Sequence, residues 1–131
     1  MSEATVSALR EVRSLGPELN RLDDLISDSI QSVEVAMRSH LSVRIKVGVD
    51  PSGEYVAFGK QGGKWQLLWC SSDGNEIPLL SAPREVRAQM LSMGHIENLI
   101  RSASAQLSSA IEQRKSALAS AAALLKVLGS V

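Results

Sequence analysis

The residue types that carry catalysis and metal binding are sparse in this sequence. Its histidines are His40 and His95, and its single cysteine is Cys70. A zinc site for hydrolysis needs ligands that converge, such as two histidines one helical turn apart beside a carboxylate, and these two histidines lie far apart in the chain. A lone cysteine excludes Cys-rich zinc sites and an internal disulfide, and no basic residue adjoins Cys70 to activate it as a nucleophile. We therefore predict a protein without catalytic residues, metal ligands or cofactors.

The segment 59–65 combines glycines and lysines, as phosphate-binding loops do. A P-loop places a glycine five positions before its final Gly-Lys pair and continues through Ser or Thr into a helix. Phe58 and Trp65 occupy those places here. A hairpin turn is the better interpretation, with Lys60 and Lys64 as weak candidates for contact with an anion.

The charge balance restricts the classes of partner. The 14 basic and 14 acidic side chains of the 131 residues cancel to a formal net charge of zero. Broad binding to nucleic acid or to an anionic membrane normally needs a basic excess, so the composition disfavours both. The charge is uneven, since residues 1–40 hold four basic and seven acidic side chains while residues 41–71 hold four and two. The start of the chain does not resemble a secretory signal, and the longest apolar run, residues 118–128, is too short to span a bilayer. We expect a single domain over residues 1–131, located in the cytoplasm.

Apolar residues at steps of three and four predict an amphipathic helix over residues 17–40. They are Leu19, Leu22, Ile26, Ile30, Val33 and Met37. Gly16 and Pro17 stand at its start, and proline suits the first turn of a helix, so we predict that the helix begins there. Residues 1–15 are then a short additional helix or a flexible lead-in.

Period-two alternation replaces the helical spacing after residue 40. It predicts a strand over residues 41–49, and two further strands follow at 54–60 and 64–71. The turn 50–53, with its proline and glycine, and the Gly62-Gly63 turn set two strand registers independently. Both registers send the same residues to one face, which predicts an antiparallel three-stranded meander. The expected inward residues are Val43, Ile45, Val47, Val56, Phe58, Trp65, Leu67 and Trp69.

The opposite face of this meander is the best candidate for a binding surface. Small residues at positions 48, 57 and 59 leave a shallow floor that polar side chains border. Such a surface suits an anionic small molecule or an element of another protein, although an ordinary solvated face has the same composition. The candidate residues are Arg44, Lys46, Gly48, Tyr55, Gly59 and Gln66.

Three elements are expected after the meander. Residues 76–80 form a possible fourth strand, which Pro78 would confine to the sheet edge. Residues 83–93 form a short helix that Gly94 ends. Residues 96–128 contain neither proline nor glycine and predict one helix about 50 Å long, whereas the helix over 17–40 reaches only about 36 Å.

The surplus length of the last helix predicts self-association. Part of its apolar stripe needs a partner other than the first helix, and a second copy of the chain is the simplest source. The many serines of this helix also fit a solvated helix that frays. Arg114 lies on the stripe, where it either fixes the register with an acid or extends its head group to water. The expected seam residues are Ala103, Leu107, Ala110, Arg114, Ala117, Ala121, Leu124 and Leu128.

These elements predict an α+β fold in which helices cover one face of the meander. The order of helix, three antiparallel strands and helix over residues 17–128 resembles that of small bacterial nucleoid-associated proteins, which dimerise and clasp DNA with projecting helices. Dimeric secretion chaperones also combine helices with a small sheet.

The residues themselves favour a non-catalytic, oligomeric interaction protein, a small regulatory or inhibitory module that binds a protein partner. Capture of an anionic small molecule or nucleotide on the second sheet face is the alternative. A DNA-binding dimer comes third, because zero net charge and an acidic first helix count against it.

Overall fold

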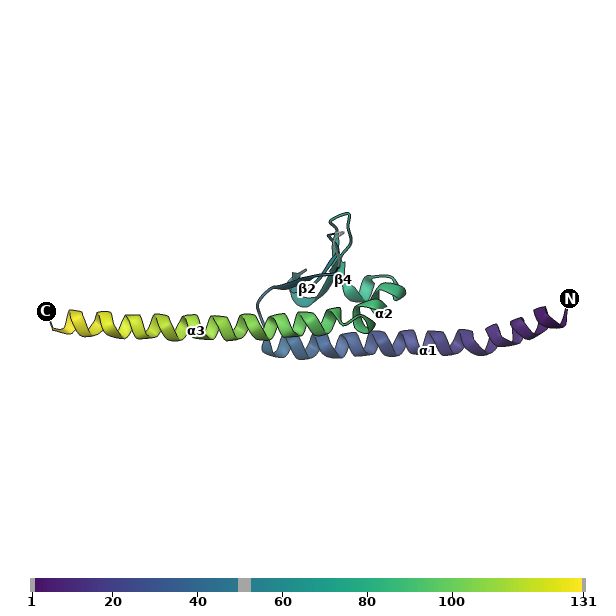
Figure 1. Ribbon diagram of the computed structural model, residues 1–131, viewed down its shortest axis with the longest axis horizontal. Helices are drawn as coiled ribbons and strands as arrows, with labels where there is room; N and C mark the ends of the chain where they lie inside the picture. The colour runs from purple at the N-terminus through teal and green to yellow at the C-terminus, as the bar shows by residue number, and fades with distance from the viewer. Residues whose placement is uncertain (1, 50–52, 131) are drawn as a thin grey trace.

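The computed structural model describes residues 2–49 and 53–130, and it has the predicted α+β fold (Figure 1). In chain order, its helices and strands are α1 (Glu3–His40), β1 (Ile45–Gly48), β2 (Tyr55–Gln61), β3 (Lys64–Cys70), β4 (Glu76–Pro78), the 3₁₀ turn η1 (Leu79–Ser81), α2 (Arg84–Ser92) and α3 (His95–Gly129). None of these helices combines the length and the apolar character needed to cross a membrane.

The predicted helix start at Gly16 and Pro17 is wrong. α1 runs without interruption from Glu3 to His40, with Pro17 inside it. Its N-cap residue is Ser2, whose hydroxyl accepts a hydrogen bond from the backbone N–H of Thr5 at 3.2 Å. Proline within a helix removes one backbone hydrogen bond, and α1 continues through Pro17 despite that loss. The lead-in is therefore helix, and α1 is about 57 Å long.

The sheet confirms both predicted registers. Its strand order is β1-β2-β3-β4, and Ile45 pairs with Phe58, while Phe58 pairs with Leu67. Gly62 and Gly63 form the β2–β3 turn with φ of +61° and +78°, a geometry that glycine adopts without strain. Residues 50–52 of the other predicted turn lie outside the described residues. The possible fourth strand is present as β4 at the sheet edge, with Pro78 as its last residue.

One inward residue and two strand boundaries were wrongly predicted. β4 ends at Pro78 and not at position 80, because residues Leu79–Ser81 form η1. β1 begins at Ile45 and not at position 41, because Leu41 ends α1 as its C-cap residue and the chain must then cross to the sheet. Val43 lies in this crossing and is 47% exposed.

The core lies between one face of the sheet and the helices. α1 packs against β3, α3 packs against β1 and β2, and α2 packs against both helices. The rings of Phe58 and Trp65 stack on this face, with centroids 5.6 Å apart, and the indole N–H of Trp69 donates to a carboxylate oxygen of Glu54 at 2.7 Å. The fully buried side chains at the centre are Ile30, Val56, Phe58, Leu67, Leu79 and Leu99.

Only the inner parts of α1 and α3 contribute to this core. α1 approaches the sheet from one side and α3 leaves it on the other, so the termini lie at opposite ends of the molecule (Figure 1). We call residues 3–25 of α1 the N-arm and residues 104–129 of α3 the C-arm; no residue of either arm is buried. The prediction that α1 is too short to cover α3 is wrong, because α1 is the longer helix. The C-arm lacks a partner because the two helices are offset along the long axis.

Candidate interaction surfaces

The first candidate surface is the sheet face turned away from the helices. Strand alternation places Tyr55 and Gly59 of β2 on this face with Gln66 of β3, and Lys46 and Gly48 of β1 beside them. These are the neighbours that the predicted registers require. Whether the face binds a ligand stays a prediction, but its geometry differs from the expected open floor.

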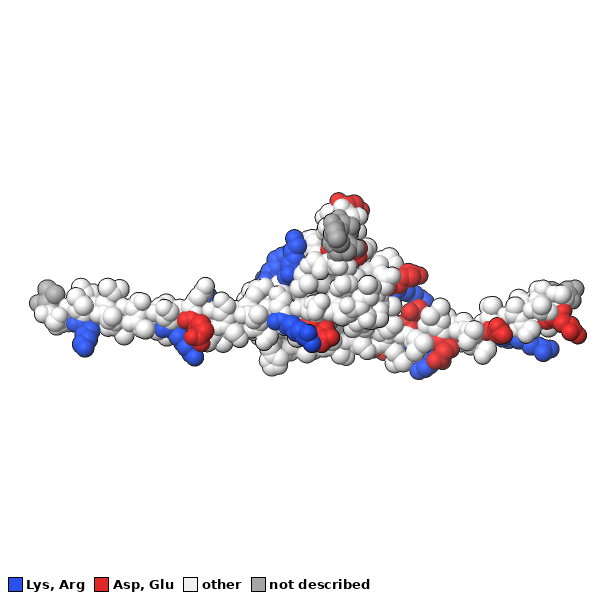
Figure 2. Space-filling model, viewed as in Figure 1, with Lys and Arg blue, Asp and Glu red and all other residues white. Residues whose placement is uncertain are grey.

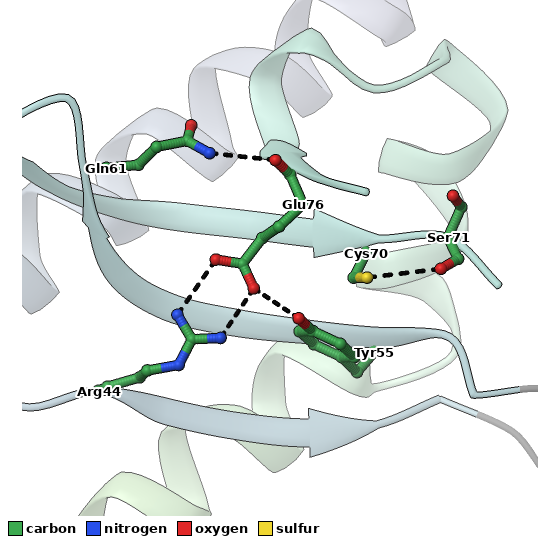
Figure 3. A network of polar contacts seen from close by, with 6 residues as sticks. All are labelled: Arg44, Tyr55, Gln61, Cys70, Ser71 and Glu76. Atoms are coloured by element: carbon green, nitrogen blue, oxygen red, sulfur yellow. Dashed lines mark hydrogen bonds and ion pairs between the residues drawn. The ribbon is translucent and has the colours of Figure 1, made fainter. Parts of the chain in front are cut away.

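Glu76, which the sequence did not single out, organises this face (Figure 3). Its carboxylate accepts two hydrogen bonds from the Arg44 guanidinium, at 3.1 and 2.7 Å, and a third from the Tyr55 hydroxyl at 2.6 Å. Its backbone carbonyl accepts a hydrogen bond from the Gln61 side chain at 3.0 Å. The β4 edge strand is what brings this carboxylate beside Arg44.

The floor between these groups is filled by the protein's own side chains. A Cβ added to Gly59 would lie 2.8 Å from a guanidinium nitrogen of Arg44, so this side chain extends directly over the glycine. The Lys46 ammonium lies 4.1 Å from the centroid of the Tyr55 ring, a cation–π contact. The residues beneath this polar cover are Ala57 and Leu68, both fully buried, and Cys70 at 2% exposure. The expected glycine floor is therefore covered at Gly59, whereas Gly48 is exposed and has no neighbour within 4 Å of a Cβ at its position.

The charges of the network compensate one another. The Arg44 guanidinium lowers the pKa of the Glu76 carboxyl, and the carboxylate in turn raises the pKa of Arg44. The hydrogen bond to Glu76 raises the pKa of the Tyr55 hydroxyl, because it stabilises the neutral phenol. Arg44 is thus already paired with an anion belonging to the chain, whereas Lys46 forms no ion pair with any described residue.

We expect Glu76→Ala to lower the free energy of unfolding at neutral pH by about 1 kcal/mol. Three hydrogen bonds to a charged group are lost, but Arg44 keeps 47% of its side chain exposed and solvent screens the pair. The lowered pKa of Glu76 means that its contribution is complete above its ordinary value of 4.5 and disappears as the pH falls below that value. Urea titrations of both proteins at neutral and acidic pH measure this: the difference must shrink in acid, and a constant difference contradicts the network.

Lys60 and Lys64, the weak anion candidates, lie on both sides of the β2–β3 hairpin and are exposed. Lys60 pairs with Trp65, whereas Lys64 pairs with Gln61, so the two lysines occupy positions of opposite parity in the sheet. Strand alternation directs them to opposite faces. The structure therefore does not bring them together on one anion.

The second candidate surface is formed by the two arms. Of the eighteen large apolar residues that are exposed in the described ranges, fourteen lie on the arms. Those of the N-arm are Val6, Leu9, Val12, Leu15, Leu19, Leu22 and Leu25. Those of the C-arm are Leu107, Ile111, Leu118, Leu124, Leu125, Val127 and Leu128. In Figure 2 the sheet projects from the upper side of the helices. The upper side of each arm is largely uncharged, and most charged side chains project from the lower side.

The predicted C-terminal seam is exposed from Leu107 onward, with Ala110 half-buried. Its first residue was wrongly assigned, because Ala103 is 6% exposed and belongs to the core. A shallow groove runs along the same arm and is lined by Leu107, Ala110, Ile111, Arg114, Lys115 and Leu118. The N-arm stripe was predicted only from Leu19 onward, because the predicted helix began at Pro17, although the steps of three and four extend back through Leu15 and Val12.

Comparison with known proteins adds no further information on these surfaces. No protein-family model, curated protein or solved structure matches the chain. Among the described residues, no group of three His, Cys, Asp or Glu side chains is placed to hold a metal ion.

Proposed function

We propose that this chain is a non-catalytic interaction protein that binds helical partners along its two apolar arms. The observation that carries the proposal is the position of the exposed apolar residues, most of which lie on helix that extends beyond the core. Contiguous exposed apolar surface on this scale is typical of sites of protein association. The arms would act as a regulator or inhibitor by covering a surface through which the partner binds another molecule.

The physical argument rests on the stability of the arms. Most helix stability in proteins comes from packing of an apolar face, and no residue of either arm is buried in the single chain. The apolar stripes of the arms contribute nothing to the described core, and each large side chain gains roughly 1.5–3 kcal/mol when it is fully buried. A partner helix laid along a stripe supplies this burial.

The alternatives have weaker support. Capture of an anion on the second sheet face loses its main expected cation, because Arg44 is paired with Glu76 at 2.7 Å and Lys46 lies over the Tyr55 ring. Clasping DNA with the arms requires basic arms, and the N-arm holds five acidic against three basic side chains.

Photo-crosslinking in cells tests the proposal. A benzophenone amino acid at Leu118 lies on the apolar stripe, and the matched control at Ser116 points about 160° away on the same arm. The same comparison on the N-arm uses Leu15 and Arg13. We expect protein adducts from the two leucine positions and few from the controls. Equal yields at stripe and control positions would overturn the proposal.

A further inference from the structure

The apolar stripes of the two arms have complementary shapes. The N-arm stripe has a seven-residue repeat of bulky residues from Val12 to Leu22, with Leu15 and Leu22 in one position and Val12 and Leu19 in the other. The C-arm seam has the same seven-residue repeat, but three of its seven positions, Ala110, Ala117 and Ala121, are alanine. The groove lies beside the first of these, between Leu107, Ile111 and Leu118. Bulky residues of one helix fit between small residues of another, as knobs fit into holes.

The arms are also complementary in charge. The N-arm holds three basic and five acidic side chains, and the C-arm holds three basic and one acidic, so the balances are minus two and plus two. Helical spacing places Glu11 and Glu18 at the border of the N-arm stripe. Arg114 lies on the C-arm stripe and Lys115 next to it. Glu18 and Lys115 also form exposed ion pairs within their own arms, with Arg21 at 2.6 Å and Glu112 at 3.6 Å, and solvent screens these pairs. An N-arm against a C-arm therefore pairs unlike charges, whereas two identical arms pair like charges.

The arms of one chain cannot meet, because they leave the core in opposite directions (Figure 1). A two-fold rotation perpendicular to the long axis reverses these directions in a second copy. It brings the N-arm of each copy beside the C-arm of the other, at both ends at once and with antiparallel chain directions. The arms have similar reach, about 35 Å for 23 residues and about 39 Å for 26.

We propose that the occupant of the arms is a second copy of this chain, in a closed two-fold dimer that pairs each N-arm antiparallel with the partner's C-arm. This inference rests on the proposed function and names its partner. Stable interfaces usually involve about 20–30 residues from each subunit. The two arms of each copy supply enough surface for this, with the fourteen exposed large apolar residues distributed over both pairings. A two-fold interface of this kind is complete and leaves no arm free for a third copy.

The mass in solution gives the first test. Light scattering of the purified chain should report about twice 14.0 kDa. Leu118→Glu places a charge in the pairing and should weaken the dimer about 100-fold, since it affects both arm pairs. Ser116→Glu, on the opposite side of the same arm, is the matched control and should leave the dimer intact. A wild-type chain that stays monomeric at all concentrations overturns the inference. If the chain is monomeric and the crosslinker at Leu118 captures a different protein, the proposed function stands and only the dimer is excluded.

Charge exchange tests which arms pair. Glu11→Lys with Glu18→Lys on the N-arm, or Arg114→Glu with Lys115→Glu on the C-arm, should each weaken the dimer by about tenfold or more. All four changes in one chain should restore it, because unlike charges again face each other across the interface. Absence of rescue in the fourfold variant, with its helix content unchanged, overturns the pairing of unlike arms.

Fluorescence transfer tests the direction of the pairing. Position 7 lies 23 residues before the core residue Ile30, and position 120 lies 21 residues after the core residue Leu99, so both are exposed positions at similar distances from the centre. Donor on Ser7→Cys mixed with acceptor on Ser120→Cys should give efficient transfer between copies, while Cys70 is buried. When donor and acceptor are both attached to Ser7→Cys, on different copies, little transfer is expected, because the two N-arms lie at opposite ends of the dimer. Strong transfer between two labels at position 7 overturns the antiparallel arrangement.

Discussion

Replacing Glu34 by alanine is expected to lower the free energy of unfolding by about 2–3 kcal/mol. Glu34 lies on α1 at 3% exposure, and its carboxylate accepts a hydrogen bond from the backbone N–H of Leu67 at 3.0 Å. β4 pairs with β3 only from Leu68 to Cys70, so the N–H of Leu67 has no strand partner on that edge. The alanine variant leaves this donor buried without an acceptor, which costs the desolvation of the group as well as the bond.

The size of this loss is measured by urea unfolding followed through Trp65 and Trp69, which lie in β3. Glu34→Gln is the control, because its side-chain carbonyl has the same reach and can accept the same hydrogen bond; it should keep more than half of the stability that the alanine variant loses. Arg38, one turn further along α1, donates to the Trp65 carbonyl at 3.3 Å, and this contact should keep α1 attached to β3 in both variants. Equal losses in the alanine and glutamine variants contradict the edge-capping role.

Replacing Pro17 by alanine is expected to stabilise the first part of α1 by about 3 kcal/mol. Pro17 lies within α1, has no N–H for the carbonyl of Arg13 and crowds that carbonyl with its ring. Alanine restores the hydrogen bond and removes the crowding. Amide hydrogen exchange over residues 3–16 should therefore slow by about 100-fold in the variant.

The effect of Pro17→Ala should stay local. No residue of the N-arm is buried, so the urea midpoint reported by the sheet tryptophans should change little. Ser14→Ala, on the same arm, restores no backbone hydrogen bond and serves as the control, with a change of less than tenfold in exchange. Exchange in Pro17→Ala as fast as in the wild-type chain would show that the proline does not weaken the arm.

The sheet was predictable from the sequence because the signals that define it are local. The Gly62-Gly63 turn and the alternation of apolar residues on both sides of it fix the pairing of Phe58 with Leu67. A shift by one residue would send Phe58 to the polar face, so the register has few alternatives. The absence of glycine and proline in residues 96–128 identified α3 in the same way, to within one residue at each end.

The parts that depend on distant residues were not predictable. Arg44 and Glu76 are 32 positions apart, and no local pattern indicates that β4 brings the carboxylate beside the guanidinium. Glu34 belongs by sequence to the acidic first helix, yet it is buried because α1 packs against β3, where its carboxylate meets the backbone N–H of Leu67. The first part of α1 was not predicted as one helix with the rest, because proline is common at the start of a helix and rare inside one.

Because the core contacts only the inner parts of α1 and α3, the length of the arms can change without a change in the core. Insertion or removal of seven residues within an arm, close to two helical turns, keeps the outer residues nearly in phase with the inner ones and changes the span by about 10 Å. Insertion or removal of three or four residues adds or removes about one turn, so small residues of one arm no longer lie opposite large residues of the other. Insertion or removal of two or five residues rotates the outer half of the arm, so that its apolar stripe faces away from the stripe of the inner half. Chains of this architecture can therefore vary their span in seven-residue increments while the central sheet and its stability stay constant.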